Sequence, residues 1–575
     1  MNLKRAVFFL IVVGALFAAD KRQEELDALR LPEKITGAGW NRIGVRDHYG
    51  VNVPLLSLHS KQDSGCGEFH DLFPLIDWLH ALRMDILQLL PLNDTGPIAS
   101  PYSPLSLYAL HPIYLSLKAL SDVRKAPDEL WEILKELKAM NQTERVDYEK
   151  VLEKKTTFLE GYVSHFKESL MERAEYQEFM KSASYWITDY ALYKVLVSKL
   201  GASWMKWPEE YQHPTPEKMA KLKTQFAEEM VFYQIVQSLC FEQMEKVHRY
   251  ANQHGVFLLG DLTILVDTNS EVVWQHPDFF KIDFSVGVPP ETGFPEGQYW
   301  GLPPYNWKVI EESQDPMLTQ RIKCFSRLYD LYRLDSCLSY FAQFEIPIGK
   351  HPIQGAYVPA NGEEAFASGK RILTSFIQAA PHFLPYAEAF AMSPKMYQLL
   401  EDFGIAKLKT YIGTNTVHSA DDLLYNGEEL PLLGFFMLSN HDNMPLQKWW
   451  AQHPAKATLL AKHYGWKYTR NLTTAQQKFL IQMTYSARPI FHVNMLYDLI
   501  PASLAYPPEK QGINVPGTDS EMNWTYRFKL SVEEITTNQL IRSLAMPSLK
   551  ENGGGVNVDQ KTDGARKGSG ALSGT

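Results

Sequence analysis

The amino-acid sequence predicts an α/β fold, a (β/α)8 barrel of the TIM type with large helical insertions between the barrel strands. Eight short apolar segments lie between Val51 and Leu496, and helical patterns separate most of them. Eight parallel strands with intervening helices are what a closed barrel of this kind requires. Three of the segments also end in a carboxylate, at the position where such barrels carry their functional side chains.

The first three candidate strands lie in the N-terminal half of the chain. Segment 51–58 (VNVPLLSL) is followed by a helical pattern over 69–84 and then by a second strand, 85–92 (DILQLLPL). A strand, a helix and a strand at this spacing begin a parallel α/β arrangement. Segment 100–112 contains three prolines and two tyrosines and is expected to be a loop. The third strand is 256–266 (VFLLGDLTILV).

A helical insertion is expected between the second and third strands. Residues 121–250 are rich in Lys, Glu, Leu, Met and Ala, with few glycines, which predicts a run of amphipathic helices. For most of this stretch, a helical cover without chemistry is the simplest interpretation. A long loop rich in Pro, Gly and aromatic residues, 287–307, follows the third strand.

The remaining five strands are expected in the C-terminal half, and one domain is predicted over 40–545. The candidate segments are 331–335 (LYRLD), 382–388 (HFLPYAE), 406–412 (AKLKTYI), 434–442 (GFFMLSNHD) and 488–496 (RPIFHVNML). The tail, 551–575, is rich in glycine and has no aromatic residues, so it is expected to be disordered.

The N-terminal segment 1–19 has the pattern of a secretory signal. Lys4 and Arg5 precede an apolar run that ends in small residues at position 19, too short for a membrane span. A buried or frayed helix is the alternative. The cysteines favour a reducing compartment, because they are far apart and lack zinc spacing. They are Cys66, Cys240, Cys324 and Cys337. We therefore expect a cytoplasmic protein, with export as the alternative.

Composition narrows the class of partner. The net charge is −9 and no basic block occurs, which argues against nucleic acid as the main partner. Aromatic residues make up 12% of the chain. Aromatic faces pack against the apolar faces of sugar rings, so this content suits a carbohydrate-binding protein, although large cores also use such residues.

The segment LYRLD carries the strongest single pattern. Arg333 and Asp335 are two residues apart, so both side chains face the same side of a strand. A fixed cation nearby favours the ionised form of a carboxylate, which a nucleophile requires. A purely structural Arg–Asp pair at a strand end is the alternative interpretation.

Two further strand ends strengthen the functional interpretation. Glu388 ends the fifth candidate strand and Asp442 ends the seventh, where His441 precedes it. The carboxyl ends of barrel strands meet at one mouth, so the three carboxylates are expected to converge there. Retaining cleavage of a glycosidic bond uses one ionised carboxylate as nucleophile and a second, protonated one as acid. A third can stabilise positive charge at the anomeric carbon.

No cofactor or metal is required by this chemistry. The sequence has no HExxH pattern, EF-hand spacing, P-loop, GxSxG or dinucleotide fingerprint.

Eight motifs, in order, resemble those of one family. They are GEFHDLFPLIDWL (67–79), LLPLNDT with SPYS (89–103), DYALYKVL with WMKWP (189–208), YANQHGVFLLGDLTILV (250–266), GQYWGLPPYNW (297–307), LYRLD (331–335), SNHDN (439–443) and NVPGT with NWTYR (514–527). The family is that of the 4-α-glucanotransferases, called amylomaltases or disproportionating enzymes, glycoside hydrolase family 77. The resemblance runs from Gly44 to Leu544, nearly the whole chain.

The resemblance implies a role for each matching residue. Asp335 would be the nucleophile, Glu388 the general acid/base and Asp442 the stabiliser of the transition state, with Arg333 orienting Asp335 and keeping it ionised. The remaining matches would bind substrate: His441 and Asp261 at the cleavage point, Asn514 in the same pocket, Ser100 and Tyr102 on the donor glucan, and Trp300 stacked on an acceptor glucose. For Tyr102 and Trp300, packing within their own loops is the alternative.

The sequence departs from the family at several positions beside these residues. Ser336 replaces the usual histidine, Met444 an aspartate, Thr263 a proline and Leu302 an asparagine, and Ala389, Phe390 and Ala391 replace Asp-Leu-Gly. The three carboxylates are retained. Because these substitutions surround the carboxylates, we expect them to affect the rate, the preferred chain length of the glucan and the exclusion of water.

The function that the resemblance implies is transfer of α-1,4-glucan segments between maltodextrins, through a covalent glycosyl-enzyme and with release of some glucose. Glycogen or starch fragments would also serve as donor or acceptor. Two alternatives remain: an α-glucan hydrolase, if water enters the altered site, and a weakly active glucan-binding protein. The sequence does not predict an oligomeric state.

Overall fold

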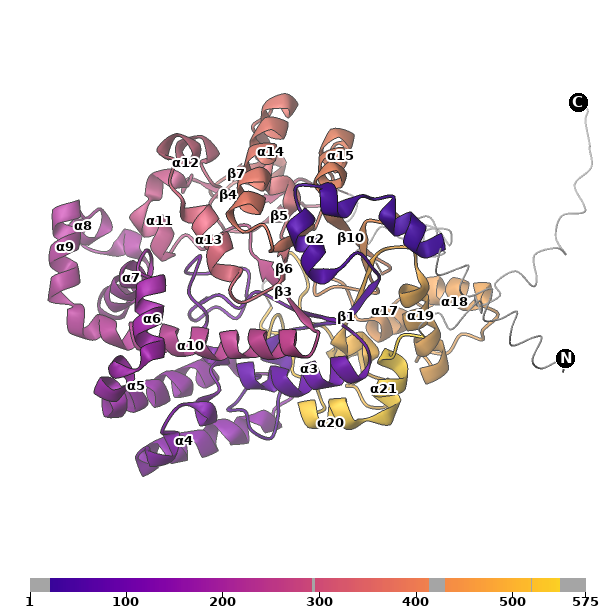
Figure 1. Cartoon of the computed structure of the whole chain (residues 1–575), viewed down its shortest axis with the longest axis horizontal. Helices are drawn as coiled ribbons and strands as arrows, with labels where there is room; N and C mark the ends of the chain where they lie inside the picture. The colour runs from indigo at the N-terminus through magenta and orange to yellow at the C-terminus, as the bar shows by residue number, and fades with distance from the viewer. Residues whose placement is uncertain (1–20, 292–294, 413–429, 519, 549–575) are drawn as a thin grey trace, which may run out of the picture.

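A closed barrel of eight parallel strands forms the centre of the protein (Figure 1). The computed structural model describes residues 21–291, 295–412, 430–518 and 520–548, so the expectations for 1–19 and 551–575 lie outside the described residues. In order around the barrel, the strands are β1 (His48–Val53), β12 (Phe491–Met495), β11 (Gly434–Met437), β10 (Ala406–Thr410), β9 (Leu384–Ala387), β6 (Leu331–Leu334), β3 (Phe257–Leu262) and β2 (Ile86–Leu89). The fold predicted from the sequence is confirmed.

Seven of the eight predicted segments contain a barrel strand, and only the first is displaced. The prediction placed it at 51–58, whereas β1 begins at His48, whose N–H donates to the carbonyl of Ile490. β1 ends at Val53 because Pro54 has no N–H for the ladder, and residues 55–57 form a 3-10 turn. In the other segments the strand ends before the last residues, which include Asp335, Glu388 and Asp442.

The strand register brings distant residues into one layer. Arg333 on β6 lies opposite Asp261 on β3 and opposite Tyr386 on β9. Asp335 and Glu388 each follow directly after the last residue of their strand. The register therefore places the arginine inside the barrel, just below two carboxylates at its mouth.

Helices fill most of the chain between β2 and β3, as the composition predicts. They gather on one side of the barrel in Figure 1. The last of them, α10, packs on α3 and leads into β3. The helices are α4 (Asp128–Ala139), α5 (Tyr148–Glu172), α6 (Ala174–Ser182), α7 (Ile187–Leu200), α8 (Glu209–Gln212), α9 (Pro216–Gln225) and α10 (Ala227–Gln253).

A second, antiparallel sheet stands beside the barrel, in the order β5-β4-β7-β8. Its strands are β4 (Phe284–Val288), β5 (Gln298–Tyr299), β7 (Gln343–Pro347) and β8 (Ala356–Val358). The segment 287–307, expected to be a loop, therefore contributes to two strands. Short strands interrupted by Gly and Pro give no periodic signal, which is why the sequence did not indicate this sheet.

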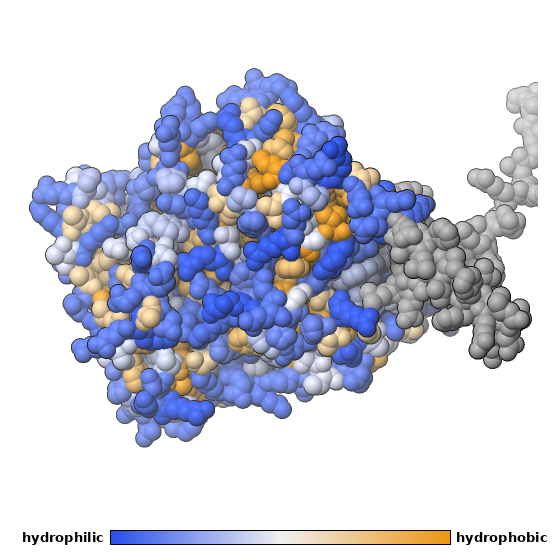
Figure 2. Space-filling view, in the orientation of Figure 1, coloured by the Kyte–Doolittle hydropathy of each residue, from blue (hydrophilic) through white to orange (hydrophobic). Residues whose placement is uncertain are grey.

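The remaining helices surround the barrel. None of the described helices is long and apolar enough to cross a membrane. The face in Figure 2 is mostly hydrophilic, with small and separate hydrophobic patches. The helices are α2 (Gly37–Ile43), α3 (Leu72–Ala81), α11 (Glu271–Gln275), α12 (Trp307–Ser313), α13 (Met317–Phe325), α14 (Gly362–Ala379), α15 (Pro394–Phe403), α17 (Leu446–Gln452), α18 (Pro454–His463), α19 (Thr474–Ser486), α20 (Val532–Thr537) and α21 (Gln539–Ala545).

Candidate active site

A cleft of about 2,090 Å³ opens at the carboxyl ends of the barrel strands. Eight of the ten residues singled out from the sequence line it: Ser100, Tyr102, Trp300, Asp335, Glu388, His441, Asp442 and Asn514. The other two, Asp261 and Arg333, lie behind its wall and are buried. The structure therefore brings the predicted residues together in two layers, one facing the cleft and one supporting it.

Arg333 is the centre of the supporting layer. Its Nη1 donates to Asp261 at 2.8 Å and to Asp335 at 3.0 Å, and its Nη2 lies 2.6 Å from the carboxylate of Glu388. The guanidinium side chain is only 3% exposed. One buried cation thus faces three carboxylates from three different strands, and its planar fork fixes their relative positions.

Asp261 has a different position from the one expected. The resemblance implies contact with sugar, but both oxygens of Asp261 accept from Arg333, and one also accepts from the hydroxyl of Tyr102 at 2.7 Å. Its side chain is fully buried. In this structure Asp261 therefore supports Arg333 and Tyr102 and does not line the cleft.

Asp335 and Glu388 are each held by Arg333 and by one backbone N–H. Ile264 donates to Asp335 at 3.1 Å, and Ser336 donates to Glu388 at 3.0 Å. Both carboxylates remain 14% exposed, toward the cleft. The two groups are fixed in orientation but accessible to a molecule that enters the cleft.

Burial dominates the charge state of Asp335. It raises the pKa of this carboxyl to about 7, because the negative charges of Glu388 and Asp261 add to the cost of burial and Arg333 offsets only part of it. The resemblance implies that Arg333 keeps Asp335 ionised, but in this structure burial and the two neighbouring carboxylates outweigh the effect of Arg333 on this pKa. One guanidinium therefore holds two carboxyl groups side by side, and an acid and a nucleophile are the two groups that retaining cleavage of a glycosidic bond requires.

Asp442 has the opposite electrostatic environment. Burial disfavours its charge, but His441 at 3.3 Å, the amide of Asn514 at 2.6 Å and the cationic Arg333 outweigh it and lower the pKa of Asp442 to about 2. Asp442 in turn raises the pKa of His441 against the effect of burial. An ionised carboxylate thus lies across the mouth from the Asp335–Glu388 pair.

The loop that carries His441 and Asp442 is anchored at both ends by Asp498. This buried carboxylate accepts from the hydroxyl of Ser439 and from the N–H of Leu446 at 2.8 Å. Sequence reasoning missed Asp498, because nothing in the segment around it indicates which loop it contacts.

Trp524 is a second residue that sequence reasoning missed. It lines the cleft, and its ring centroid lies 5.4 Å from that of Tyr102 and 5.9 Å from that of His441. Tyr102 and His441 are themselves stacked at 5.1 Å. The three rings form one wall of the cleft, so Tyr102 both packs in an aromatic cluster and faces the cavity. The motif NWTYR, which contains Trp524, was the sequence signal that could have identified this residue.

Trp300 and Ser100 also lie on the cleft wall. The indole N–H of Trp300 donates to the side chain of Gln298 at 2.9 Å, and Trp300 follows strand β5 directly. The hydroxyl of Ser100 accepts from the N–H of Tyr102 at 3.4 Å. Both side chains are half-buried.

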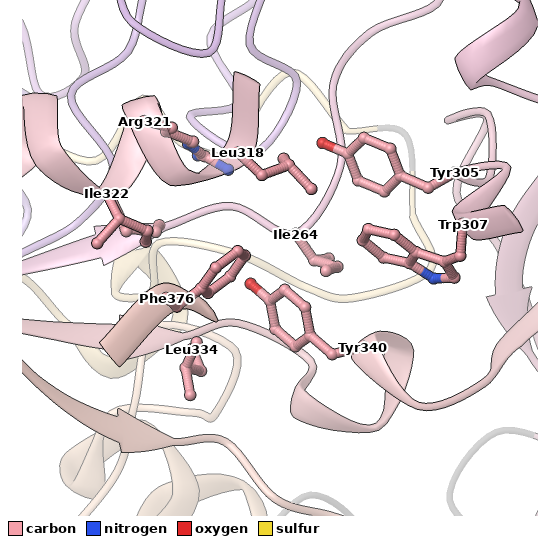
Figure 3. Close-up of a pocket in the computed structure, with 10 residues that line it drawn as sticks. Ile264, Tyr305, Trp307, Leu318, Arg321, Ile322, Leu334, Tyr340 and Phe376 are labelled. Atoms are coloured by element: carbon pink, nitrogen blue, oxygen red, sulfur yellow. The ribbon is translucent and has the colours of Figure 1, made fainter. Parts of the chain in front are cut away.

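A second, much smaller cavity of about 10 Å³ shares the lining residue Ile264 with the cleft (Figure 3). Arg321, which lines it, donates to the carbonyl of Thr263 at 2.7 Å and to its hydroxyl at 3.0 Å. Thr263 precedes Ile264, whose N–H binds Asp335. The threonine that replaces the usual proline is therefore part of a contact that fixes the backbone beside Asp335.

Two departures after Glu388 have structural consequences. Phe390 is 47% exposed and lines the cleft. Ala391, where the family motif has glycine, has a φ of 53°, a conformation that favours glycine.

Among the described residues, no group of three or more His, Cys, Asp or Glu side chains is arranged to hold a metal ion.

The chain is similar to known proteins over most of its length. The sequence model of a family described as 4-alpha-glucanotransferase matches residues 53–532. The 4-alpha-glucanotransferase of Chlamydia pneumoniae is 32% identical over 514 residues, which cover 87% of this chain and 95% of that protein. That of Aquifex aeolicus is 28% identical over 495 residues, 84% of this chain and 95% of that protein.

A solved structure shows the same fold. The amylomaltase from Streptococcus agalactiae, determined in complex with acarbose, aligns with a TM-score of 0.70 at 21% sequence identity. The alignment covers 87% of this chain and 98% of that chain.

Proposed function

Because the chain belongs to the family of 4-alpha-glucanotransferases, we propose that it transfers segments of α-1,4-glucans by a retaining mechanism in which Asp335 is the nucleophile. The observation that carries this proposal is the contact of Asp335 and Glu388 with the two terminal nitrogens of Arg333. The span of one guanidinium favours the short carboxylate separation of retaining enzymes, about 5–5.5 Å, over the wider spacing of inverting ones.

The first step forms a covalent intermediate. Asp335 attacks the anomeric carbon of the donor glucan while Glu388 gives its proton to the oxygen of the departing chain. The bond between the anomeric carbon and that oxygen breaks as the bond to Asp335 forms. Asp442, which is ionised, stabilises the positive charge that develops at the anomeric carbon.

The second step reverses the first with a different sugar. Glu388, now ionised, takes the proton from the 4-hydroxyl of an acceptor glucan, and this oxygen displaces Asp335. An acceptor held in the cleft competes with water through proximity and orientation. Water can win this competition if the acceptor is bound weakly, which is the hydrolase alternative.

The remaining residues have positioning or binding roles in this proposal. Arg333 orients both carboxylates, and Asp261 fixes Arg333. His441, Asn514, Ser100, Tyr102 and Trp300 contact sugar from the cleft wall, and Trp524 joins them. No cofactor takes part.

The substrates and the compartment are part of the proposal. Maltodextrins and fragments of glycogen or starch are the proposed donors and acceptors. We place the protein in the cytoplasm, because its four cysteines are buried singly, as unpaired thiols. Purification of the native protein with a mature N-terminus near Asp20 would contradict this placement.

The test of the proposal is incubation with maltotriose, with products resolved by chain length. We expect glucose together with a ladder of longer maltodextrins, and loss of both in Asp335→Asn. Glucose and maltose without longer products would show that water is the acceptor. Binding of maltotriose without any turnover would support the weakly active binding protein instead.

A further inference from the structure

Three aromatic side chains lie in one row across the small sheet. Tyr299 on β5 pairs with Gly287 on β4, and Phe344 on β7 pairs with Tyr357 on β8. Continuing the β4–β7 register, in which Val286 pairs with Glu345, places Gly287 beside Phe344. Directly paired residues of antiparallel strands share a face. The row therefore runs Tyr299, Gly287, Phe344, Tyr357 on one face of the sheet.

The two ends of this row are exposed to the cleft. Tyr299 is 43% exposed and Tyr357 is 37% exposed, whereas Phe344 is 7% exposed and packs edge-on against Tyr357 at 5.1 Å. Gly287 has no side chain, and an added Cβ would lie 2.0 Å from the carbonyl oxygen of Gln298. The same Cβ would lie 2.6 Å from Cδ1 of Ile346, so Gly287 is a closely packed position that lines the cleft without a side chain of its own.

The row belongs to the same cleft as the candidate catalytic residues. Tyr299, Phe344 and Tyr357 line the cavity that Asp335 and Glu388 also line. Its volume of about 2,090 Å³ is well above the roughly 300–1,000 Å³ of an ordinary small-molecule site. The cleft therefore has room for a chain of sugars that extends well beyond the cleavage point.

We propose that this row is a glucan-binding platform that holds the part of a long α-1,4-glucan remote from the cleavage point. The inference rests on the proposed function, since the bound chain continues from the catalytic carboxylates. Tyrosine rings offer apolar faces to sugar rings and a hydroxyl at the edge. The outer strands of a four-stranded sheet are three strand spacings apart, about 14 Å, which extends the row over several linked sugars.

The rim of the platform fits a carbohydrate. Glu291, Glu296, Gln298 and His351 line the cleft around the aromatic row. These side chains offer acceptors and donors to sugar hydroxyls at the edge of an aromatic face. Glu296 and His351 lie 3.2 Å apart, and both are largely exposed. Such an arrangement of stacking faces with a polar rim favours a glucan over an apolar partner.

The test compares a short and a long glucan in the same variant. In an Asp335→Asn background, which prevents turnover, calorimetry measures binding of maltotriose and maltoheptaose with and without Tyr299→Ala and Tyr357→Ala. We expect the Kd for maltoheptaose to rise about tenfold in the double variant, the value of a lost aromatic contact. The Kd for maltotriose should change much less. In active enzyme, kcat/KM for maltoheptaose should fall about tenfold relative to that for maltotriose.

The control is Ile353→Ala, an apolar side chain in the connection between β7 and β8 that is 73% exposed and does not line the cleft. It should leave both affinities unchanged. Equal changes for the two sugars, or no change for either, would overturn the platform. Failure of the proposed function would give a different result, which is a lack of maltotriose transfer in the unmodified protein. In that case the comparison of maltotriose and maltoheptaose binding would still test the platform.

Discussion

Asp335 and Glu388 contact the two terminal nitrogens of one guanidinium, that of Arg333, at 3.0 and 2.6 Å. The two residues follow different strands and are far apart in sequence, yet this shared cation fixes their separation. A nucleophile and an acid that must act on the same glycosidic bond require such a fixed separation.

Removal of this cation should have a large effect. We expect Arg333→Met to lower kcat/KM for maltotriose by about 10²–10⁴-fold and to cost about 3–5 kcal/mol of stability, because it removes the cation that the buried carboxylates share. Arg333→Lys is the matched control. It retains the charge but cannot reach three carboxylates, so it should recover stability more than activity. Steady-state kinetics and chemical denaturation check the two effects.

The pH dependence of the first step follows from the pKa of Asp335, which burial raises to about 7. Only the ionised form attacks, so kcat/KM should fall about tenfold for each pH unit below this value. In Glu388→Gln a neighbouring negative charge is lost, which lowers the pKa of Asp335. With α-glucosyl fluoride, whose leaving group needs no acid, the acid limb of this variant should therefore move to lower pH. An unchanged limb would assign the titration to another group.

Asp498 should affect catalysis through the loop that it anchors, which carries His441 and Asp442. We expect Asp498→Ala to lower kcat about tenfold with a smaller change in KM, and to cost about 2–3 kcal/mol, because the Ser439 hydroxyl and the Leu446 N–H lose their acceptor. Asp498→Asn keeps one acceptor oxygen and should recover part of both losses. If kcat of the alanine variant stays at the unmodified level, the anchor has no role in positioning His441 and Asp442.

Ala391 offers a stabilising substitution. Its φ of 53° costs an alanine about 1–2 kcal/mol relative to glycine, part of which is offset by the greater freedom of glycine in the unfolded chain. Ala391→Gly should therefore raise the stability by about 0.5–1 kcal/mol in chemical denaturation. Ala389→Gly is the control. Ala389 has no positive φ, so this change should lower the stability of the protein.

The barrel and its three carboxylates could be predicted because they depend on local patterns. Each strand is a short apolar run, and Asp335, Glu388 and Asp442 follow runs whose ends must meet at one mouth. The contact between Arg333 and Asp261 could not be predicted, because it depends on the register between β6 and β3. The same holds for Trp524 and Asp498, which reach the site from the C-terminal part of the chain.

The small sheet was also beyond prediction. Its strands β5 and β8 contain only two and three residues, and the pairing of Tyr299 with Gly287 arises from a hairpin within a segment rich in Pro and Gly. No periodic pattern marks such strands. The row of aromatic side chains therefore became visible only in three dimensions.

The most direct test of the mechanism is to trap the glycosyl-enzyme and locate its bond. The Glu388→Gln variant is incubated with α-maltosyl fluoride. This donor forms the intermediate without an acid, and the variant lacks the base that would resolve it. Peptides of the labelled protein are then analysed by mass spectrometry. The proposed mechanism predicts a maltosyl ester on the peptide that contains Asp335, and none in the variant that also carries Asp335→Asn. A label on another carboxylate, or its persistence without Asp335, would contradict the mechanism.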